Sequence, residues 1–119
     1  MELSVQSDDG NLLRLKIRGR ITQIHMPADL TEAFLRLLGP CGYARRVLVD
    51  LSESEFIDSS GLSWLVLLQK RFREAKGQLI LHSIPVRVLE IIRVMSLDRV
   101  LRIAEDEPAA MAILQGESG

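Results

Sequence analysis

The sequence predicts a single α/β domain with a mixed β-sheet and the element order ββαβαβαβα. Near the N-terminus, over residues 13–18, apolar and charged residues alternate strictly, which is typical of a strand with one buried face. Further along, two continuous apolar runs at residues 47–49 and 79–81 are separated by a helical pattern. Such runs are expected of central parallel strands joined by a helical crossover. The length of 119 residues fits one domain.

The N-terminal segment is expected to form a β-hairpin. A short strand over residues 3–7 precedes a turn at residues 8–11, whose Asp, Gly and Asn residues tolerate a left-handed backbone. The second strand places Leu13, Leu15 and Ile17 on one face. Because two strands joined by a tight turn run antiparallel, the hairpin makes the sheet mixed.

The first helix is predicted to begin near Pro27, where the missing N–H of proline costs little. Apolar residues then recur at helical spacing over residues 30–38. Gly39 and Pro40 end this helix.

The rest of the chain alternates strands with helices. The predicted elements are a strand over residues 46–51, a helix over about 60–76 ended by Gly77, a strand over 79–81, a helix beginning at 83–85, a strand over 100–103 and a helix over 107–114. In the third helix, Val88, Leu89, Ile92 and Met95 are expected to face the core. The domain is expected to span residues 1–115, followed by a disordered tail over 116–119.

Composition argues against several classes of protein. A formal net charge of −1 is unusual for a general nucleic-acid binder. With Cys41 as the only cysteine and two distant histidines, we expect no disulfide, metal site or cofactor. The N-terminus lacks a signal-peptide pattern, and the longest apolar run, residues 64–68, is too short for a membrane span. We therefore expect a cytoplasmic protein.

Residues 56–62, Phe-Ile-Asp-Ser-Ser-Gly-Leu, lie between a predicted buried strand and a helix, where functional groups gather in α/β sheets. Asp58, Ser59 and Ser60 can each cap that helix, and capping is the commoner role of such residues. One cap needs only one of them, so at least one hydroxyl is expected to face outward. A helix N-terminus accepts a phosphate attached to such a serine.

The segment Asp58-Ser59-Ser60-Gly61-Leu62, preceded by Val-Leu-Val-Asp-Leu at residues 47–51, resembles the signature of the STAS domain family, which includes bacterial anti-sigma factor antagonists. Residues 19–22, 77–81 and 85–100 resemble other parts of that family in order and spacing. The resemblance covers nearly the whole chain. It implies a single STAS-like domain.

The resemblance also implies a function in transcription regulation. In that family, the first serine of the motif accepts phosphate from an anti-sigma factor that is also a serine kinase, and the matching position is Ser59. The unphosphorylated antagonist binds this kinase and frees a sigma factor, and phosphorylation ends the binding. A phosphate adds about −1.5 to −2 charge, here beside Asp58, to a surface that must lose water on docking.

We expect Ser59 to face solvent and Ser60, nearer the helix, to turn inward as its cap. Loops at the same end of a parallel sheet meet, so the expected partner surface joins two loops and includes Asp58, Ser60, Gly61, Leu62, Ile24 and His25. Trp64 is expected to be a core ring. An interface anchor one turn from Ser59 is the alternative role.

Two other functions remain open. The chain can be a STAS scaffold subunit of another assembly, stressosome-like or lipid-transporting, in which the serine is not phosphorylated. An enzyme would need Ser59, Asp58 and either His25 or His82 as a triad, but the Gly-x-Ser-x-Gly elbow is absent and His82 ends a buried strand. We therefore expect no catalytic activity.

Overall fold

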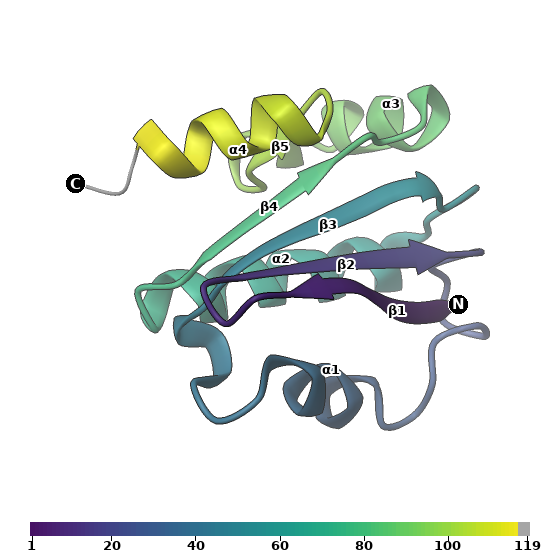
Figure 1. The fold of residues 1–119 in the computed structure, drawn as a ribbon. Helices are drawn as coiled ribbons and strands as arrows, with labels where there is room; N and C mark the ends of the chain where they lie inside the picture. The colour runs from purple at the N-terminus through teal and green to yellow at the C-terminus, as the bar shows by residue number, and fades with distance from the viewer. Residues whose placement is uncertain (117–119) are drawn as a thin grey trace.

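The computed structural model describes residues 1–116 and contains a five-stranded sheet in the order β1-β2-β3-β4-β5 (Figure 1). β1 (Glu2–Asp8) is antiparallel to β2 (Leu12–Arg18). The strands that follow, β3 (Arg46–Glu53), β4 (Gln78–His82) and β5 (Ile103–Ala104), are parallel to β2. The predicted element order ββαβαβαβα and the mixed sheet are confirmed.

Four α-helices connect or follow the strands in this part of the chain: α1 (Leu30–Leu38), α2 (Ser59–Glu74), α3 (Val86–Val94) and α4 (Glu107–Gly116). Two 3₁₀ turns, Gly42–Ala44 and Leu97–Arg99, precede β3 and β5. Because α4 includes Gly116, only residues 117–119 of the expected tail lie outside the described residues.

The two faces of the sheet are covered unequally. Leu13, Leu15 and Ile17 of β2 face the main core, which also takes side chains from α1, α2 and α3. Within residues 1–116, α4 is the only helix that covers the opposite face, over a small cluster that includes Leu48 and Ile80 (Figure 1). The alternation in β2 therefore confirms the prediction of a half-buried strand: apolar side chains on one face pack in the core, and the other face carries charged side chains.

The two central strands confirm the prediction of adjacent buried parallel strands. Val47 of β3 is in register with Leu79 of β4, and Val49 is in register with Leu81. All four side chains are at most 1% exposed. The carboxyl ends of these strands point to one edge of the sheet, where the motif that contains Ser59 follows β3.

Two local predictions were wrong. Met95 does not face the core but is 56% exposed, because α3 ends at Val94 and Ser96 turns the chain away with a left-handed φ of 57°. The predicted strand over residues 100–103 begins only at Ile103, since the 3₁₀ turn continues into Val100, whose N–H donates to the Leu97 carbonyl at 3.0 Å.

Candidate functional site

Asp58 is the cap of α2. Its carboxylate accepts hydrogen bonds from the backbone N–H of Gly61 at 2.9 Å and from that of Gln23 at 3.0 Å. The expectation that Ser60 would be the cap is therefore wrong. Asp58 has the extended backbone of an N-cap and precedes the first helical residue, Ser59. A single carboxylate thus caps α2 and also holds the loop that follows β2.

The same two donors determine the charge of this residue. The Gln23 N–H first, and then the Gly61 N–H, hold the pKa of the Asp58 carboxyl below its usual range, because both favour the ionised form. A fixed negative charge therefore stands directly before Ser59 at neutral pH.

Gly61 lets α2 approach the loop after β2. A Cβ atom on this glycine would lie 2.1 Å from the Ile21 carbonyl oxygen and 2.7 Å from Cγ1 of Ile57. Gly61 is itself buried. Gly61 therefore permits close backbone contact with the loop of this chain that follows β2. Its role is to position that loop under the site.

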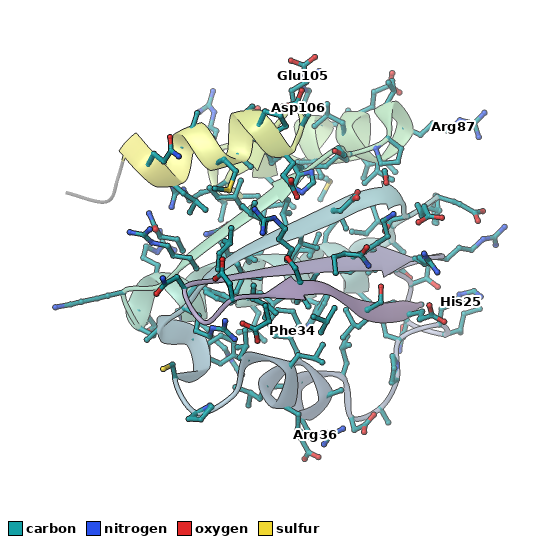
Figure 2. The ribbon with its side chains drawn as sticks, in the orientation of Figure 1. His25, Phe34, Arg36, Arg87, Glu105 and Asp106 are labelled. Carbon is teal, nitrogen blue, oxygen red and sulfur yellow. The ribbon has the colours of Figure 1, made fainter. Side chains whose placement is uncertain are left out.

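The two loops expected to meet do lie side by side at this edge. Ile21 and Ile57 form a parallel β-bridge, and the Ile21 N–H donates to the Phe56 carbonyl at 2.9 Å. Beyond the bridge, Ile24 is 88% exposed. His25 is exposed too, with Nδ1 hydrogen-bonded to the Thr22 hydroxyl, and Figure 2 shows it pointing away from the body of the protein.

Ser59 is exposed at the rim of an apolar hollow. Within residues 1–116 its hydroxyl makes no hydrogen bond, since Asp58 already caps the helix. The hollow has a volume of about 370 Å³ and is lined, beside Ser59, by Leu62, Ser63, Val66, Met95 and Leu97. Of these five residues, sequence reasoning assigned only Leu62 to the partner surface. The signal that could have drawn attention to Met95 is its place at the very end of the third apolar pattern.

Comparison with known proteins agrees with this geometry. A family model described as "Mlab, STAS domain" matches residues 4–103. The chain belongs to the STAS domain family. It is 29% identical over 112 residues to BtrV of Bordetella bronchiseptica, named as a candidate anti-sigma factor antagonist, and the match covers 94% of this chain and 93% of BtrV.

Two solved structures share the STAS fold. An anti-sigma-factor antagonist (STAS) domain protein from Planctomyces limnophilus has a TM-score of 0.75 at 21% identity, covering 95% of this chain and 97% of that one. The anti-sigma factor antagonist SpoIIAA in its unphosphorylated form has a TM-score of 0.72 at 14% identity. The match covers 99% of this chain and 100% of that one. The resemblance noted from the motif therefore extends to the whole fold.

Trp64 is a core residue of this STAS domain. Its side chain is 7% exposed, and its ring meets Phe34 of α1 edge-on with centroids 5.8 Å apart. The indole N–H is buried without a hydrogen-bond partner. A ring buried to this extent offers a partner little surface, so Trp64 supports α2 from within.

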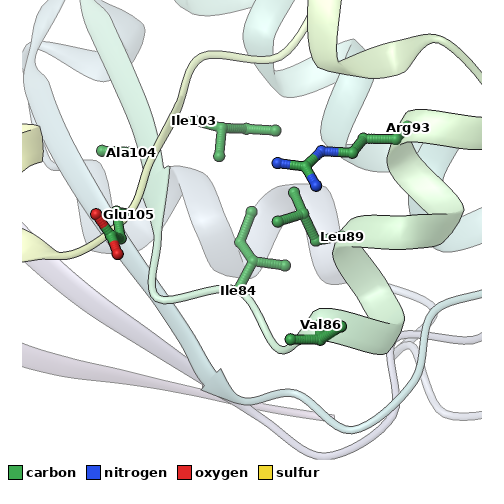
Figure 3. Close-up of a pocket in the computed structure, with 7 residues that line it drawn as sticks. All are labelled: Ile84, Val86, Leu89, Arg93, Ile103, Ala104 and Glu105. Carbon is green, nitrogen blue, oxygen red and sulfur yellow. The ribbon is translucent and has the colours of Figure 1, made fainter.

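A further hollow of about 520 Å³ lies between α3 and β5, away from Ser59 (Figure 3). Leu89, expected in the core, is only half-buried because it lines this hollow. Figure 3 shows the Arg93 side chain extending across it from α3, with Glu105 at the opposite side. The opposite charges of these two residues leave the lining without a net charge.

The residues of a hydrolytic triad are not joined in this structure. His82 is 4% exposed, burial lowers its pKa, and its Nδ1 is hydrogen-bonded to the Ser83 hydroxyl. Within the described part of the chain, neither His82 nor His25 hydrogen-bonds to Ser59.

Residues 1–116 contain no group of three His, Cys, Asp or Glu side chains that could hold a metal ion. None of the helices at positions 1–116 has the length and apolar character needed to cross a bilayer.

Proposed function

We propose that this STAS domain is a cytoplasmic anti-sigma factor antagonist that acts by binding, not by catalysis. It binds an anti-sigma factor serine kinase while Ser59 is unmodified, which releases a sigma factor, and phosphorylation of Ser59 ends the binding. The observation that carries the proposal is an exposed, unbonded hydroxyl between the Asp58 carboxylate and an apolar hollow. Similarity to BtrV along nearly the whole chain supports the class of partner.

The geometry suits reversible modification. Because Asp58 caps α2, a phosphate on Ser59 removes no hydrogen bond that the helix needs. Ser59 is also the first residue of α2, where the helix dipole favours an added negative charge. The kinase therefore has an accessible acceptor whose modification leaves the fold intact.

The same geometry explains how a phosphate would prevent binding. Four of the five residues that line the hollow beside Ser59 are apolar, so a partner side chain that enters it must displace water. A phosphate at the rim holds water and lies next to the Asp58 carboxylate, whose charge repels it. The neighbouring loop extends the proposed surface with Ile24 and His25, while Asp58, Ser60 and Gly61 position it.

The experiment combines site mapping with binding. Incubation with the cognate kinase and ATP, followed by mass spectrometry, is expected to place phosphate on Ser59. In calorimetry, Ser59→Ala is expected to bind the kinase like the wild type. Ser59→Asp binds more weakly but not negligibly, because one charge imitates phosphate only in part. Ala112→Asp adds the same charge on an exposed position of α4 and is expected to leave binding unchanged.

A pair of neighbouring residues tests the hollow itself. Met95 lines the hollow and is 56% exposed, whereas Val94 is 82% exposed and does not line it. Met95→Asp is expected to weaken kinase binding by at least about tenfold, because a carboxylate in an apolar contact must lose water. Val94→Asp is the matched control and is expected to bind normally.

Two outcomes would contradict the proposal. Phosphate on Ser60 alone would show that the wrong serine had been chosen. A bound, active kinase that leaves both serines unmodified would favour the alternative, a STAS scaffold subunit of another assembly.

A further inference from the structure

A second hollow, of about 320 Å³, lies at the C-terminal end of α2 and is lined by three arginines. Arg73 comes from the last turn of α2, whereas Arg99 and Arg102 come from the segment that leads into β5. Arg73 and Arg99 are exposed, and Arg102 is half-buried. This hollow lies at the edge of the sheet opposite to Ser59, because Arg73 and Arg102 stand before the strands β4 and β5 and Ser59 stands after β3.

Among residues 1–116, no carboxylate lines the hollow. Its other lining residues are Gln69, Gly77 and Val100. Within residues 1–116, no ion pair joins Arg73 or Arg99 to an acidic side chain. By contrast, Arg18 and Arg45 each pair with a carboxylate within 3.1 Å. Arg73 and Arg99 therefore concentrate positive charge at this hollow, in a protein whose net charge is −1.

Gln69 adds an amide donor to this lining. Its side chain is 5% exposed, and its Oε1 accepts a hydrogen bond from the Arg102 backbone N–H at 3.0 Å. That bond fixes which end of the amide is oxygen, so the nitrogen is the remaining end. In the described part of the chain, no hydrogen bond uses that nitrogen. Because Gln69 lines the hollow, this amide can donate a hydrogen bond to an anion held between the arginines.

The backbone around the hollow is held in place. A Cβ on Gly77 would lie 1.9 Å from the Tyr43 carbonyl oxygen, and the Gly77 N–H donates to the Phe72 carbonyl at 2.8 Å. Arg71, in the same last turn of α2 as Arg73, lies over the Tyr43 ring, with its guanidinium carbon 5.8 Å from the ring centroid. The wall that carries the arginines is thus fixed against a neighbouring loop.

The geometry points to a binding site for a phosphate group, either free phosphate or a phosphate monoester. Guanidinium groups present paired N–H donors that match phosphate oxygens, and the two positive charges of Arg73 and Arg99 match a phosphate dianion better than a single carboxylate. The C-terminal end of α2 carries a partial charge of only about −0.5, which the arginines outweigh. The anion would accept hydrogen bonds from the guanidinium groups and from the Gln69 amide. This site is independent of the proposed function at Ser59.

Titration of the ¹⁵N-labelled protein tests this site by NMR. The probes are inorganic phosphate, glycerol 3-phosphate and malonate, each added at constant ionic strength against chloride. Saturable shifts of the Gly77, Val100 and Arg102 amide signals are expected with both phosphates and not with malonate. Tighter binding of glycerol 3-phosphate would identify a monoester as the ligand, and tighter binding of inorganic phosphate would identify the free ion. Equal binding of malonate would overturn the assignment to phosphate.

Single substitutions locate the site. Arg73→Gln and Arg99→Gln are each expected to weaken phosphate binding by about tenfold, the scale of one charge-assisted hydrogen bond. Arg87→Gln removes the same charge from an exposed residue at the opposite edge of the sheet (Figure 2) and is expected to change binding little. Equal weakening by all three variants would indicate a general charge effect and overturn the proposal.

Gln69→Glu is the sharpest variant. It keeps an oxygen to accept the Arg102 N–H, so the fold is expected to persist, but it replaces the amide donor with a carboxylate. Phosphate binding is then expected to be lost while the thermal transition remains cooperative. Undiminished binding in this folded variant, or no saturable shift in the wild type at millimolar phosphate, would overturn the proposal.

Discussion

The two ends of α2 are packed in the same way and carry opposite charge. At the N-terminal end, a Cβ on Gly61 would lie 2.1 Å from the Ile21 carbonyl oxygen, and at the C-terminal end a Cβ on Gly77 would lie 1.9 Å from that of Tyr43. The first end carries the Asp58 carboxylate and the exposed Ser59 hydroxyl. The second carries arginines and the buried Gln69 amide.

This difference shows how one helix can present chemically different groups at its two ends. The glycines hold both helix ends against neighbouring backbone, so the packing does not distinguish them. The side chains do, and they follow the helix dipole, which favours an acid at the N-terminus and bases at the C-terminus. The function of each end therefore has to be inferred from its side chains, because the STAS fold positions both equally well.

The largest expected effect is on the core that the two ends share. Trp64→Ala is expected to lower the free energy of unfolding by about 4 kcal/mol, because it removes a buried ring packed on Phe34. Trp64→Phe is expected to cost much less, since it keeps a ring and removes an indole N–H that has no partner. Urea denaturation measures both. Normal stability of Trp64→Ala with lost kinase binding would instead make Trp64 an interface anchor.

The glycines test whether the two ends are equally constrained. Gly61→Ala and Gly77→Ala are each expected to lower the free energy of unfolding by about 2–3 kcal/mol, because the added methyl overlaps a backbone carbonyl oxygen. Gly116→Ala is the control, since a Cβ there meets nothing within 4 Å. If chemical denaturation finds a loss of stability for only one of the two variants, the two ends of α2 are not equally constrained.

A smaller effect is expected at the cap. Asp58→Ala is expected to lower the melting temperature by about 5 °C, since α2 loses its cap and the loop after β2 loses its attachment at Gln23. Asp29→Ala is the matched control, because Asp29 precedes α1 without a side-chain cap bond. Calorimetry compares the two variants. An equal decrease in both would show that the Asp58 contacts contribute nothing specific.

The smallest effect is on the dependence of stability on pH. The pKa of the Asp58 carboxyl is lowered in the folded state by the Gln23 and Gly61 N–H groups, so the unfolded chain takes up its proton first as the pH falls. The stability that Asp58 contributes is therefore complete above about pH 4, the ordinary range of an aspartate, and is lost below it. Melting temperatures of the wild type and Asp58→Ala are expected to converge as the pH decreases towards 2.5. A constant difference would rule out the charged cap.

Local patterns were enough to predict the elements of this fold and the position of its motif. Alternation over residues 13–18 and the runs at 47–49 and 79–81 depend only on which face of each strand is buried, and that is a property of neighbouring residues. The motif could be placed at the start of α2 for the same reason. The prediction for Met95 was wrong because the helical spacing of apolar residues continues past Val94 in the sequence. In the structure α3 ends at Val94, and the left-handed backbone at Ser96 turns the chain away from the core.

Only the tertiary structure decided how the motif residues divide their roles. Asp58 rather than Ser60 is the cap because its carboxylate also reaches the Gln23 N–H, a backbone group that no sequence pattern distinguishes. The hollow beside Ser59 forms because the tertiary fold places Met95 beside α2. The arginine-lined hollow forms because the fold places Arg73 and Arg99 around the same space. Side-chain periodicity carries information over one or two turns of chain. Contacts between distant segments follow from how the crossovers stack those segments, which is set only when the whole core is packed.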